Sequence, residues 1–481
     1  MNHSMVRYIT ARLLQIEALL MIFPLIVSFI YGESWTYKMS YISVILGLII
    51  IGQLIAWKKP TNKRMTAREG LVIVALTWIL YSFFGGLPFV LNGDIPSLID
   101  AFFETSSGFT TTGSSILSDV ELLSHSSLFW RSFTHLVGGM GILVFALAIM
   151  PQIDAQSVHI MKAEVPGPTF GKLVSKLSST ARILYVIYLV ITGVVVTLLW
   201  LSGMPLFDSL LHAFGVAGTG GFGIKNGSVV SYQNPLAEWI IGIGMVVFAI
   251  NFNLFYMILI GRAKQALKSE ELKGFLVIVL GAVLLICLNL WPSYESISTL
   301  IRDVFFTVSS VISTSGFSTA DFGKWPGFSQ TVLLLLMFVG GSAGSTAGGL
   351  KVSRVIHYIK IAINEVRKVV QPNRILTIHY DDKPMTKEVK QGVMSYFVVY
   401  MCVFFLLLLL VSISAPDFLS GFSAVAATLN NIGPALGQFG PAYSFGSLND
   451  FTKIMLSFSM LAGRLELFPI LILFAPRTWR R

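Results

Sequence analysis

Four glycine-bearing turns recur along the chain, each at the same distance from a polar residue. Every glycine stands thirteen positions after an aspartate or a serine, and apolar side chains follow that polar residue closely. The four pairs are Asp100 with Gly113, Asp208 with Gly221, Asp303 with Gly316, and Ser420 with Gly433. Glycine reaches backbone angles that are closed to other residues, so a tight turn can aim its carbonyl oxygens inward. A ring of such carbonyls replaces the water around a partly dehydrated cation, as it does in potassium filters.

The candidate filter residues are the last three of each turn. They are Thr111, Thr112 and Gly113; Thr219, Gly220 and Gly221; Thr314, Ser315 and Gly316; and Asn431, Ile432 and Gly433. Asp and Ser are preferred N-cap residues, so the spacing predicts a short helix of about eight residues before each turn. The C-terminal end of a helix carries about half a negative charge. Four such ends aimed at one centre favour a cation over an anion.

Long apolar runs must carry these turns into a membrane. A helix needs about 20 apolar residues to cross the hydrocarbon core. Mean hydropathy is +0.75 and only 12% of the 481 residues are charged. Ten runs are long enough: 10–32, 38–57, 70–92, 127–151, 182–203, 235–261, 274–292, 328–350, 391–414 and 450–475. The sequence therefore predicts an all-α polytopic membrane protein with ten transmembrane helices.

Basic residues lie in alternate loops. The segments 58–69, 152–181, 262–273 and 351–390 and the C-terminal tail are rich in Lys and Arg, whereas 92–126 and 415–449 contain neither. Because cytoplasmic loops carry the excess of Lys and Arg, both termini are expected in the cytoplasm. The four glycine turns then fall in outer loops, where short apolar stretches predict re-entrant helices. We expect a multi-pass protein of the cell (inner) membrane.

The chain divides into four pseudo-repeated helix–pore loop–helix units, an arrangement resembling a tetrameric potassium channel. The expected boundaries are a helix pair at 1–60, repeat 1 at 61–155, repeat 2 at 175–265, repeat 3 at 270–370 and repeat 4 at 391–481. The remaining segment, 371–390, has an alternating run before a turn. It is either a small cytoplasmic hairpin or a solvated linker. A hairpin there is a candidate docking site for a regulatory ring.

Four stretches resemble the TrkH/KtrB superfamily of potassium transporters, and the TrkH branch in particular. They are Thr105–Gly113, Gly340–Gly349, Leu429–Gly437 and Ala462–Pro469. The resemblance implies a homodimer with one pore per protomer, and a TrkA-type cytoplasmic ring that binds nucleotide and controls opening. It carries the filter glycines over to Gly113, Gly221, Gly316 and Gly433. Relatives with Ser at the first position tend to pass Na⁺, so Gly113 favours K⁺.

A second group of residues is the candidate gate. The run 340–349 contains Gly340, Gly341, Gly344, Gly348 and Gly349 where the inner half of a span is expected. Each interior glycine costs a helix about 1 kcal/mol relative to alanine, which predicts broken helix. The alternative is close helix packing through small residues. The resemblance implies that Arg464, inside the last run, projects into the pore below the filter; the alternative is an arginine paired across helices.

Other signals exclude several classes of function. Basic residues sit in short loops and not on a polar domain, which argues against nucleic acid. Gly218–Gly223 fits GxGxxG but lacks the strand before it, and no GxxxxGK[ST] run appears, so we expect no nucleotide on this chain. Neither a catalytic residue nor a His, Cys or carboxylate group with ligand spacing is expected; His135, His212, Cys287 and Cys402 are expected to pack.

Three functions remain at this stage. The first is gated K⁺ uptake through a selective pore. The second is a carrier that couples K⁺ to Na⁺ or H⁺, which needs ionisable groups within spans; Glu17 and Glu466 are among the few candidates. The third, an integral-membrane enzyme, needs a convergent polar site that the sequence does not show.

Overall fold

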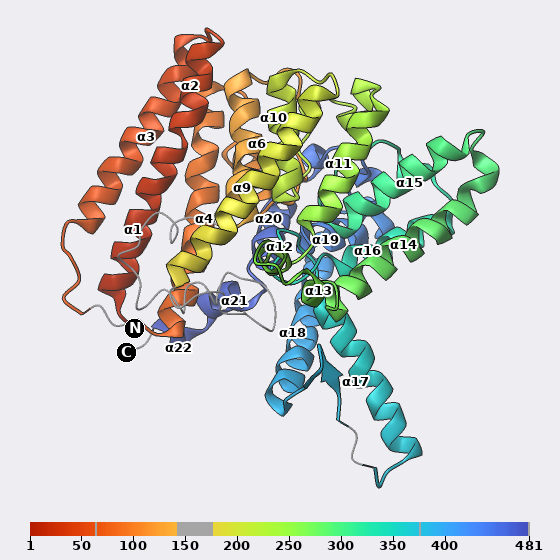
Figure 1. Cartoon of the computed structure of the whole chain (residues 1–481). Coiled ribbons are helices and arrows are strands. Elements are labelled where there is room, and N and C mark those ends of the chain that lie inside the picture. Colours follow the sequence, from red (N-terminus) through yellow and green to blue (C-terminus); the bar gives the residue numbers. More distant parts are fainter. Residues whose placement is uncertain (63–64, 142–176, 375–376, 480–481) are drawn as a thin grey trace.

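The protein is helical, and several of its long helices run side by side on the left of the molecule in Figure 1. The computed structural model describes residues 1–62, 65–141, 177–374 and 377–479. Both chain ends lie at the lower end of the molecule as drawn in Figure 1. The same end carries α17 (Val352–Val370), which projects well beyond the other helices.

Six helical segments in the described residues are long and apolar enough to cross a membrane. The first is α1 (His3–Leu20) with α2 (Ile22–Ile30), followed by α3 (Trp35–Ala56), α4 (Ala67–Asn92), α9 (Leu177–Leu201), α14 (Glu270–Leu290) and α18 (Lys387–Val411). A seventh is possible if α11 (Pro235–Phe248) and α12 (Phe252–Leu259), which meet at 91°, count as one span.

The sequence predicted more continuous spans than this. The runs 235–261, 328–350 and 450–475 are each broken, and of 127–151 only the part up to residue 141 lies among the described residues. The helices in these runs are α6 (His125–Gly139), α11, α16 (Gly327–Val339) and α20 (Asp450–Arg464), of 15, 14, 13 and 15 residues. After α16 the chain is non-helical as far as α17. After α20, Glu466 and Leu467 take positive φ angles before α21 (Phe468–Phe474).

Four further helices precede the glycine turns: α5 (Leu98–Phe109), α10 (Leu206–Gly218), α15 (Ile297–Ile312) and α19 (Phe418–Leu429). They are longer than expected, with 12, 13, 16 and 12 residues. Asp100, Asp208, Asp303 and Ser420 lie inside them and are not the N-caps. The N-cap residues are Ser97, Pro205, Ser296 and Asp417, and three of these accept a hydrogen bond from the first turn. The ends of the helices, which matter for the site, fall where the spacing predicts.

The packing of these helices is cyclic. In chain order, α4–α5–α6, α9–α10–α11, α14–α15–α16 and α18–α19–α20 each place one of these four short helices between two other helices. Each short helix packs on the helix before it, and also on the last helix of another trio: α10 on α6, α15 on α11, α19 on α16, and α5 on α20. The last contact closes the circle and sets the four glycine turns around one centre.

A small hairpin lies beside α17. Its strands, β1 (His379–Tyr380) and β2 (Lys383–Pro384), pair antiparallel, with His379 opposite Pro384. Lys360 of α17 binds the Glu270 carboxylate and the His379 carbonyl oxygen, and Asp381 accepts the Glu270 amide at 2.8 Å. The described part of the segment 371–390 thus contains a two-stranded hairpin at 379–384.

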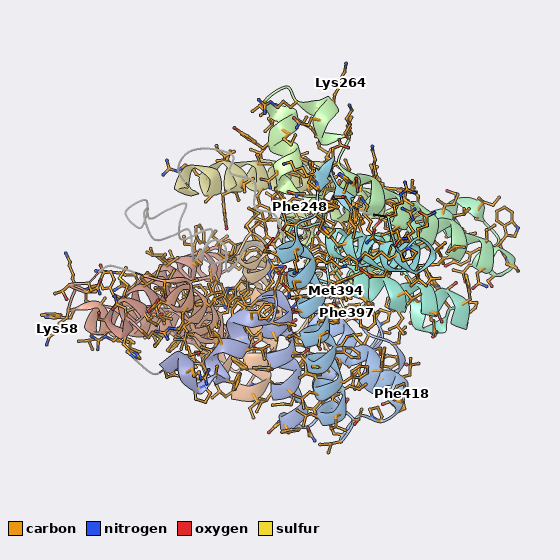
Figure 2. All side chains as sticks on the ribbon, turned by 90° about the horizontal axis from the view of Figure 1, so that it is seen from below. Lys58, Phe248, Lys264, Met394, Phe397 and Phe418 are labelled. Atoms are coloured by element: carbon orange, nitrogen blue, oxygen red, sulfur yellow. The ribbon has the colours of Figure 1, made fainter. Side chains whose placement is uncertain are left out.

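The remaining elements are short. They are the helices α13 (Ala263–Ala266) and α22 (Pro476–Trp479), and 3₁₀ turns at Ser228–Tyr232, Trp291–Ser293, Phe322–Lys324, Gly437–Phe439 and Phe445–Ser447. Seen from below, Lys58 after α3 and Lys264 on α13 extend from two separate edges of the molecule (Figure 2). Met394 and Phe397 of α18 lie nearer its middle in that view.

Candidate ion-binding site

The four short helices end in the same backbone motif. In α5 the Thr111 amide donates to the Gly108 carbonyl oxygen at 3.1 Å, and the Thr112 amide donates to the Ser107 carbonyl oxygen at 2.8 Å. These two bonds define a Schellman cap. The same pair of bonds occurs from Thr219 and Gly220 in α10, from Thr314 and Ser315 in α15, and from Asn431 and Ile432 in α19.

Two positive φ angles follow each helix. The first of the three candidate filter residues in each turn is left-handed, with φ of 55° at Thr111, 56° at Thr219, 59° at Thr314 and 55° at Asn431. The glycine two positions later is also positive, at 85°, 69°, 82° and 105° in chain order. A β-branched residue rarely takes such an angle, and Thr does so three times here. Strain of this kind clusters at functional sites.

The four glycines lie against one another in a ring. A methyl group on Gly113 would stand 2.0 Å from the Gly220 carbonyl oxygen. The corresponding distances are 1.9 Å from Gly221 to the Ser315 oxygen, 2.2 Å from Gly316 to the Ile432 oxygen, and 2.7 Å from Gly433 to the Thr112 oxygen. Each turn therefore touches the next, and the fourth touches the first. Only glycine fits where neighbouring backbones approach this closely.

The ring opens on one side into a shared cavity of about 140 Å³. All four glycines line it, together with side chains from the loops that follow the turns, such as Ser114, Ser318 and Tyr443. The four candidate glycines thus converge on one cavity, and contacts between neighbouring turns place the residues just before them, Thr112, Gly220, Ser315 and Ile432, in the same ring. This geometry can surround a small cation with a ring of backbone carbonyl oxygens next to the cavity.

The glycine-rich segment lies on the opposite side of the ring. The Gly348 amide donates to Thr314 Oγ1 at 2.7 Å, and a methyl group on Gly348 would meet the Asn430 carbonyl oxygen. Gly340 and Gly349 touch at the base of the segment, so that residues 340–349 form a closed loop. Gly340, Gly344 and Gly349 have positive φ, which explains why the inner half of this run is not helix.

The loop is held by the break between α11 and α12. The Ser342 amide donates to the Ala249 carbonyl oxygen at 2.9 Å, and the Phe252 amide donates to the Gly344 carbonyl oxygen at 3.1 Å. Glu271 of α14 accepts the Ala343 amide at 2.7 Å. The loop therefore has a defined resting position, with specific bonds that must break if it moves.

Arg464 ties this loop to two other helices. Its guanidinium donates to the Thr346 carbonyl oxygen at 2.6 Å, and to the Gly138 and Gly139 carbonyl oxygens at 2.5 and 2.6 Å. Gly463 beside it packs on the Leu429 carbonyl oxygen at the end of α19. As expected from the spacing, Glu466 is not its partner and binds Arg354 instead, at 2.5 Å. The charge of Arg464 thus lies on the loop side of the ring.

Sequence analysis missed one polar pair beside the ring. Glu104 of α5 and Arg131 of α6 form an ion pair at 2.5 Å, and both are buried. The signal was present, because Arg131 is a charged residue inside the apolar run 127–151, and such residues face protein or water.

The two histidines pack, as expected. His135 stacks on Phe222 with ring centroids 4.2 Å apart, and His212 stacks on Phe317 at 5.6 Å. Among the described residues no group of three His, Cys, Asp or Glu side chains is placed to hold a metal ion. The GxGxxG run at Gly218–Gly223 is the end of α10 and its turn.

The apolar helices, with a ring of backbone turns among them, define the class as a multi-pass membrane protein with an internal polar path. Residues 38–481 match the TrkH family, described as cation transport protein, and the chain belongs to that family. It is 36% identical over 467 residues to the Trk system potassium uptake protein TrkH of Salmonella typhimurium, with 96% of each chain covered.

Two further relatives cover almost the whole chain. The Trk system potassium uptake protein TrkG of Escherichia coli is 33% identical over 490 residues, with all of both chains covered. The crystal structure of the potassium transporter TrkH from Vibrio parahaemolyticus has a TM-score of 0.89 at 32% identity and covers 99% of each chain. The resemblance inferred from the motifs is therefore confirmed.

Proposed function

We propose that this chain mediates potassium uptake across the cell membrane through a gated, K⁺-selective pore. The observation that carries this proposal is the ring of four glycine turns, each with its Schellman cap and its contact to the next. The names of the relatives, potassium uptake proteins and a potassium transporter, favour K⁺ as the ion.

In this proposal the twelve turn residues, 111–113, 219–221, 314–316 and 431–433, form the K⁺ filter. The four helix ends aimed at the ring supply partial negative charge. The loop 340–349 and Arg464 form the gate on its inner side. The four trios of helices are the four units of the pore, and the broken helices together with the six long ones make up ten passes through the membrane.

The setting of the pore completes the proposal. Both termini and α17 lie in the cytoplasm, the chain is a homodimer with one pore per protomer, and a TrkA-type nucleotide-binding ring controls the gate. This assignment rests on the distribution of basic residues and on the family. A carrier coupling K⁺ to Na⁺ or H⁺ remains the alternative. Recording from purified protein in a bilayer separates the two, because a channel gives discrete openings that reverse at the K⁺ potential.

The filter is tested by Gly113→Ser in protein reconstituted into vesicles. The side chain would collide with the Gly220 carbonyl oxygen at a positive φ, so the ring must shift. We expect the Rb⁺/Na⁺ uptake ratio to fall by about tenfold, a change of ~1.4 kcal/mol in relative binding free energy. Gly203→Ser is the matched control, because Gly203 also has a positive φ but nothing within 4 Å. An unchanged ratio in folded, inserted Gly113→Ser contradicts the filter assignment.

A further inference from the structure

The buried pair Glu104–Arg131 joins two of the four turns. On the side of the first turn, Glu104 accepts hydrogen bonds from Ser115 Oγ at 2.9 and 3.1 Å and from the Ile116 amide at 3.0 Å. Ser115 and Ile116 stand two and three residues after Gly113, the last residue of the first turn. The carboxylate therefore holds in place the non-helical segment that follows the first turn.

Arg131 makes the matching contacts to the second turn. Its Nη1 donates to the Gly223 carbonyl oxygen at 2.8 Å, and its guanidinium lies 3.6 Å from the centroid of the Phe222 ring. Phe222 and Gly223 directly follow Gly221. One ion pair thus spans from the exit of the first turn to the exit of the second, beside the contact between Gly113 and Gly220.

The other three units have different residues at these places. Counted back from the glycine, the positions equivalent to Glu104 hold His212, Thr307 and Ala424. Counted from the N-cap of the helix, the positions equivalent to Arg131 hold Ile241, Leu333 and Leu456, each with 0% of its surface exposed. An apolar side chain therefore suffices to pack this part of a unit.

Stability does not explain the pair. Replacing a buried ion pair by apolar groups of similar size is often neutral or stabilising, because two charges need not be desolvated. What apolar groups cannot do is bind backbone atoms of two adjacent turns at once. The planar guanidinium, with five donors in a fixed fork, suits this double contact.

We propose that Glu104 and Arg131 are positioning residues that set the spacing between the first and second turns, and thereby determine ion selectivity. The inference rests on the proposed function, in which the ring is the K⁺ filter. The four contacts between neighbouring turns differ in their side chains. At the contact between the first and second turns, the ion pair holds the two turns together. Loss of either residue lets the first two turns move apart or twist, and the oxygens no longer match a dehydrated K⁺.

The test compares variants whose charge changes in opposite directions. Glu104→Gln adds one positive charge beside the outer cavity, and Arg131→Met removes one. If the pair acts by position, both lower the Rb⁺/Na⁺ uptake ratio, by about fivefold or more in a site that selects by fit. If the two variants shift only the apparent affinity for external K⁺, in opposite directions and with the ratio unchanged, the pair acts by charge and the proposal is overturned.

The double variant Glu104→Met/Arg131→Met separates selectivity from folding. Because the other units bury an apolar residue at the Arg131 position and an uncharged one or a histidine at the Glu104 position, we expect it to insert and to keep its melting temperature while losing selectivity. A wild-type ratio in this double variant also overturns the proposal. If Arg131→Met does not fold, Arg131→Lys decides: it keeps the ion pair but cannot also reach Gly223, so a wild-type ratio counts against positioning.

Two controls locate any failure. Arg302→Met removes another inter-unit ion pair, with Glu238 at 2.7 Å, whose partners lie on α11 and α15 and not on a turn. It should leave the ratio unchanged. Gly113→Ser is measured alongside. If it too leaves the ratio unchanged, the filter assignment fails; if it lowers the ratio while the pair variants do not, only the inference about the pair fails.

Discussion

At the scale of single residues, the site is made of backbone more than of side chains. The filter positions differ from turn to turn, with Thr, Gly, Ser and Ile in the middle place, yet the hydrogen bonds and φ angles repeat. What repeats is the conformation, and the glycine two places after the left-handed residue is what permits it.

Arg464 places a charge on the loop side of the ring. Arg464→Ala removes three charged hydrogen bonds to carbonyl oxygens, each worth about 1.5–3 kcal/mol when made to a charged group. We expect basal K⁺ flux without the partner to rise at least threefold (about 0.65 kcal/mol). Vesicle uptake of Rb⁺ measures it, with the melting temperature recorded to show that the variant is folded.

Arg464→Lys distinguishes a charge barrier from a brace. A lysine keeps the positive charge, but its single ammonium cannot replace a fork that reaches Thr346, Gly138 and Gly139. Low flux in the lysine variant means that charge closes the path, and high flux means that bracing of the loop does. If the alanine variant instead misfolds, Arg464 is a structural residue and the loop alone is the barrier.

At the scale of elements, the predictable parts were those set by local chemistry. The turns after α5, α10, α15 and α19 were found from glycine spacing, because a Schellman cap depends on a few adjacent residues. The broken helix at 340–349 was found for the same reason. The starts of the short helices were wrong, because Ser97, Ser296 and Asp417 cap them earlier than the repeated aspartates suggested.

Breaks within the apolar runs could not all be predicted from hydropathy. In the run 235–261, apolar residues continue through Ala249 and Ile250, and hydropathy cannot report the 91° bend between α11 and α12. That bend is fixed by the loop that docks on it, a contact distant in sequence. The Glu104–Arg131 pair was not predicted for a similar reason. Its role depends on contacts with two turns that are distant from each other in sequence.

The loop 340–349 gives the prediction at this scale. Deleting Ala343–Thr346 removes the bond from Phe252 to Gly344 and the bond from Arg464 to Thr346, while Gly340 and Gly349 still meet at the base of the loop. We expect basal Rb⁺ flux to rise severalfold with the Rb⁺/Na⁺ ratio unchanged, since the filter turns are untouched. Gly281→Ala, in α14 with nothing within 4 Å, is the control for a glycine change. A folded, inserted deletion variant that stays closed contradicts the gating role.

At the scale of the whole molecule, one continuous path joins the ring to the far end of α17. The loop under the ring leads straight into α17, which projects from the body (Figure 1) and carries the hairpin through Lys360 and the stacking of His357 on Tyr380 at 4.4 Å. Asp381 at the hairpin tip reaches back to the start of α14. Under the proposed function, force that the cytoplasmic ring applies to the hairpin is transmitted to the loop through α17.

Removing the hairpin tests this path. Replacing residues 378–385 by a short Gly-Ser linker should leave Rb⁺/Na⁺ selectivity and basal flux as in the wild type. If the proposed nucleotide-binding ring controls the gate, this variant should lose the change in flux that the ring produces, because the link to α17 is lost. Flux assays with and without the purified partner measure this, and a co-sedimentation assay reports whether the partner still binds. A full response to the partner in this variant contradicts the coupling role.

The cyclic packing of four unequal trios on one chain has a consequence for inheritance. In an assembly of four identical subunits, a change in one codon alters every corner of the ring together, and most such changes destroy it. Here each codon governs one corner. A mutation can replace Gly113 by Ser, or Glu104 and Arg131 by apolar residues, while the other glycine turns stay unchanged. The ion selectivity of such a chain can therefore change through substitutions in one turn at a time, and each intermediate sequence still forms a working transporter.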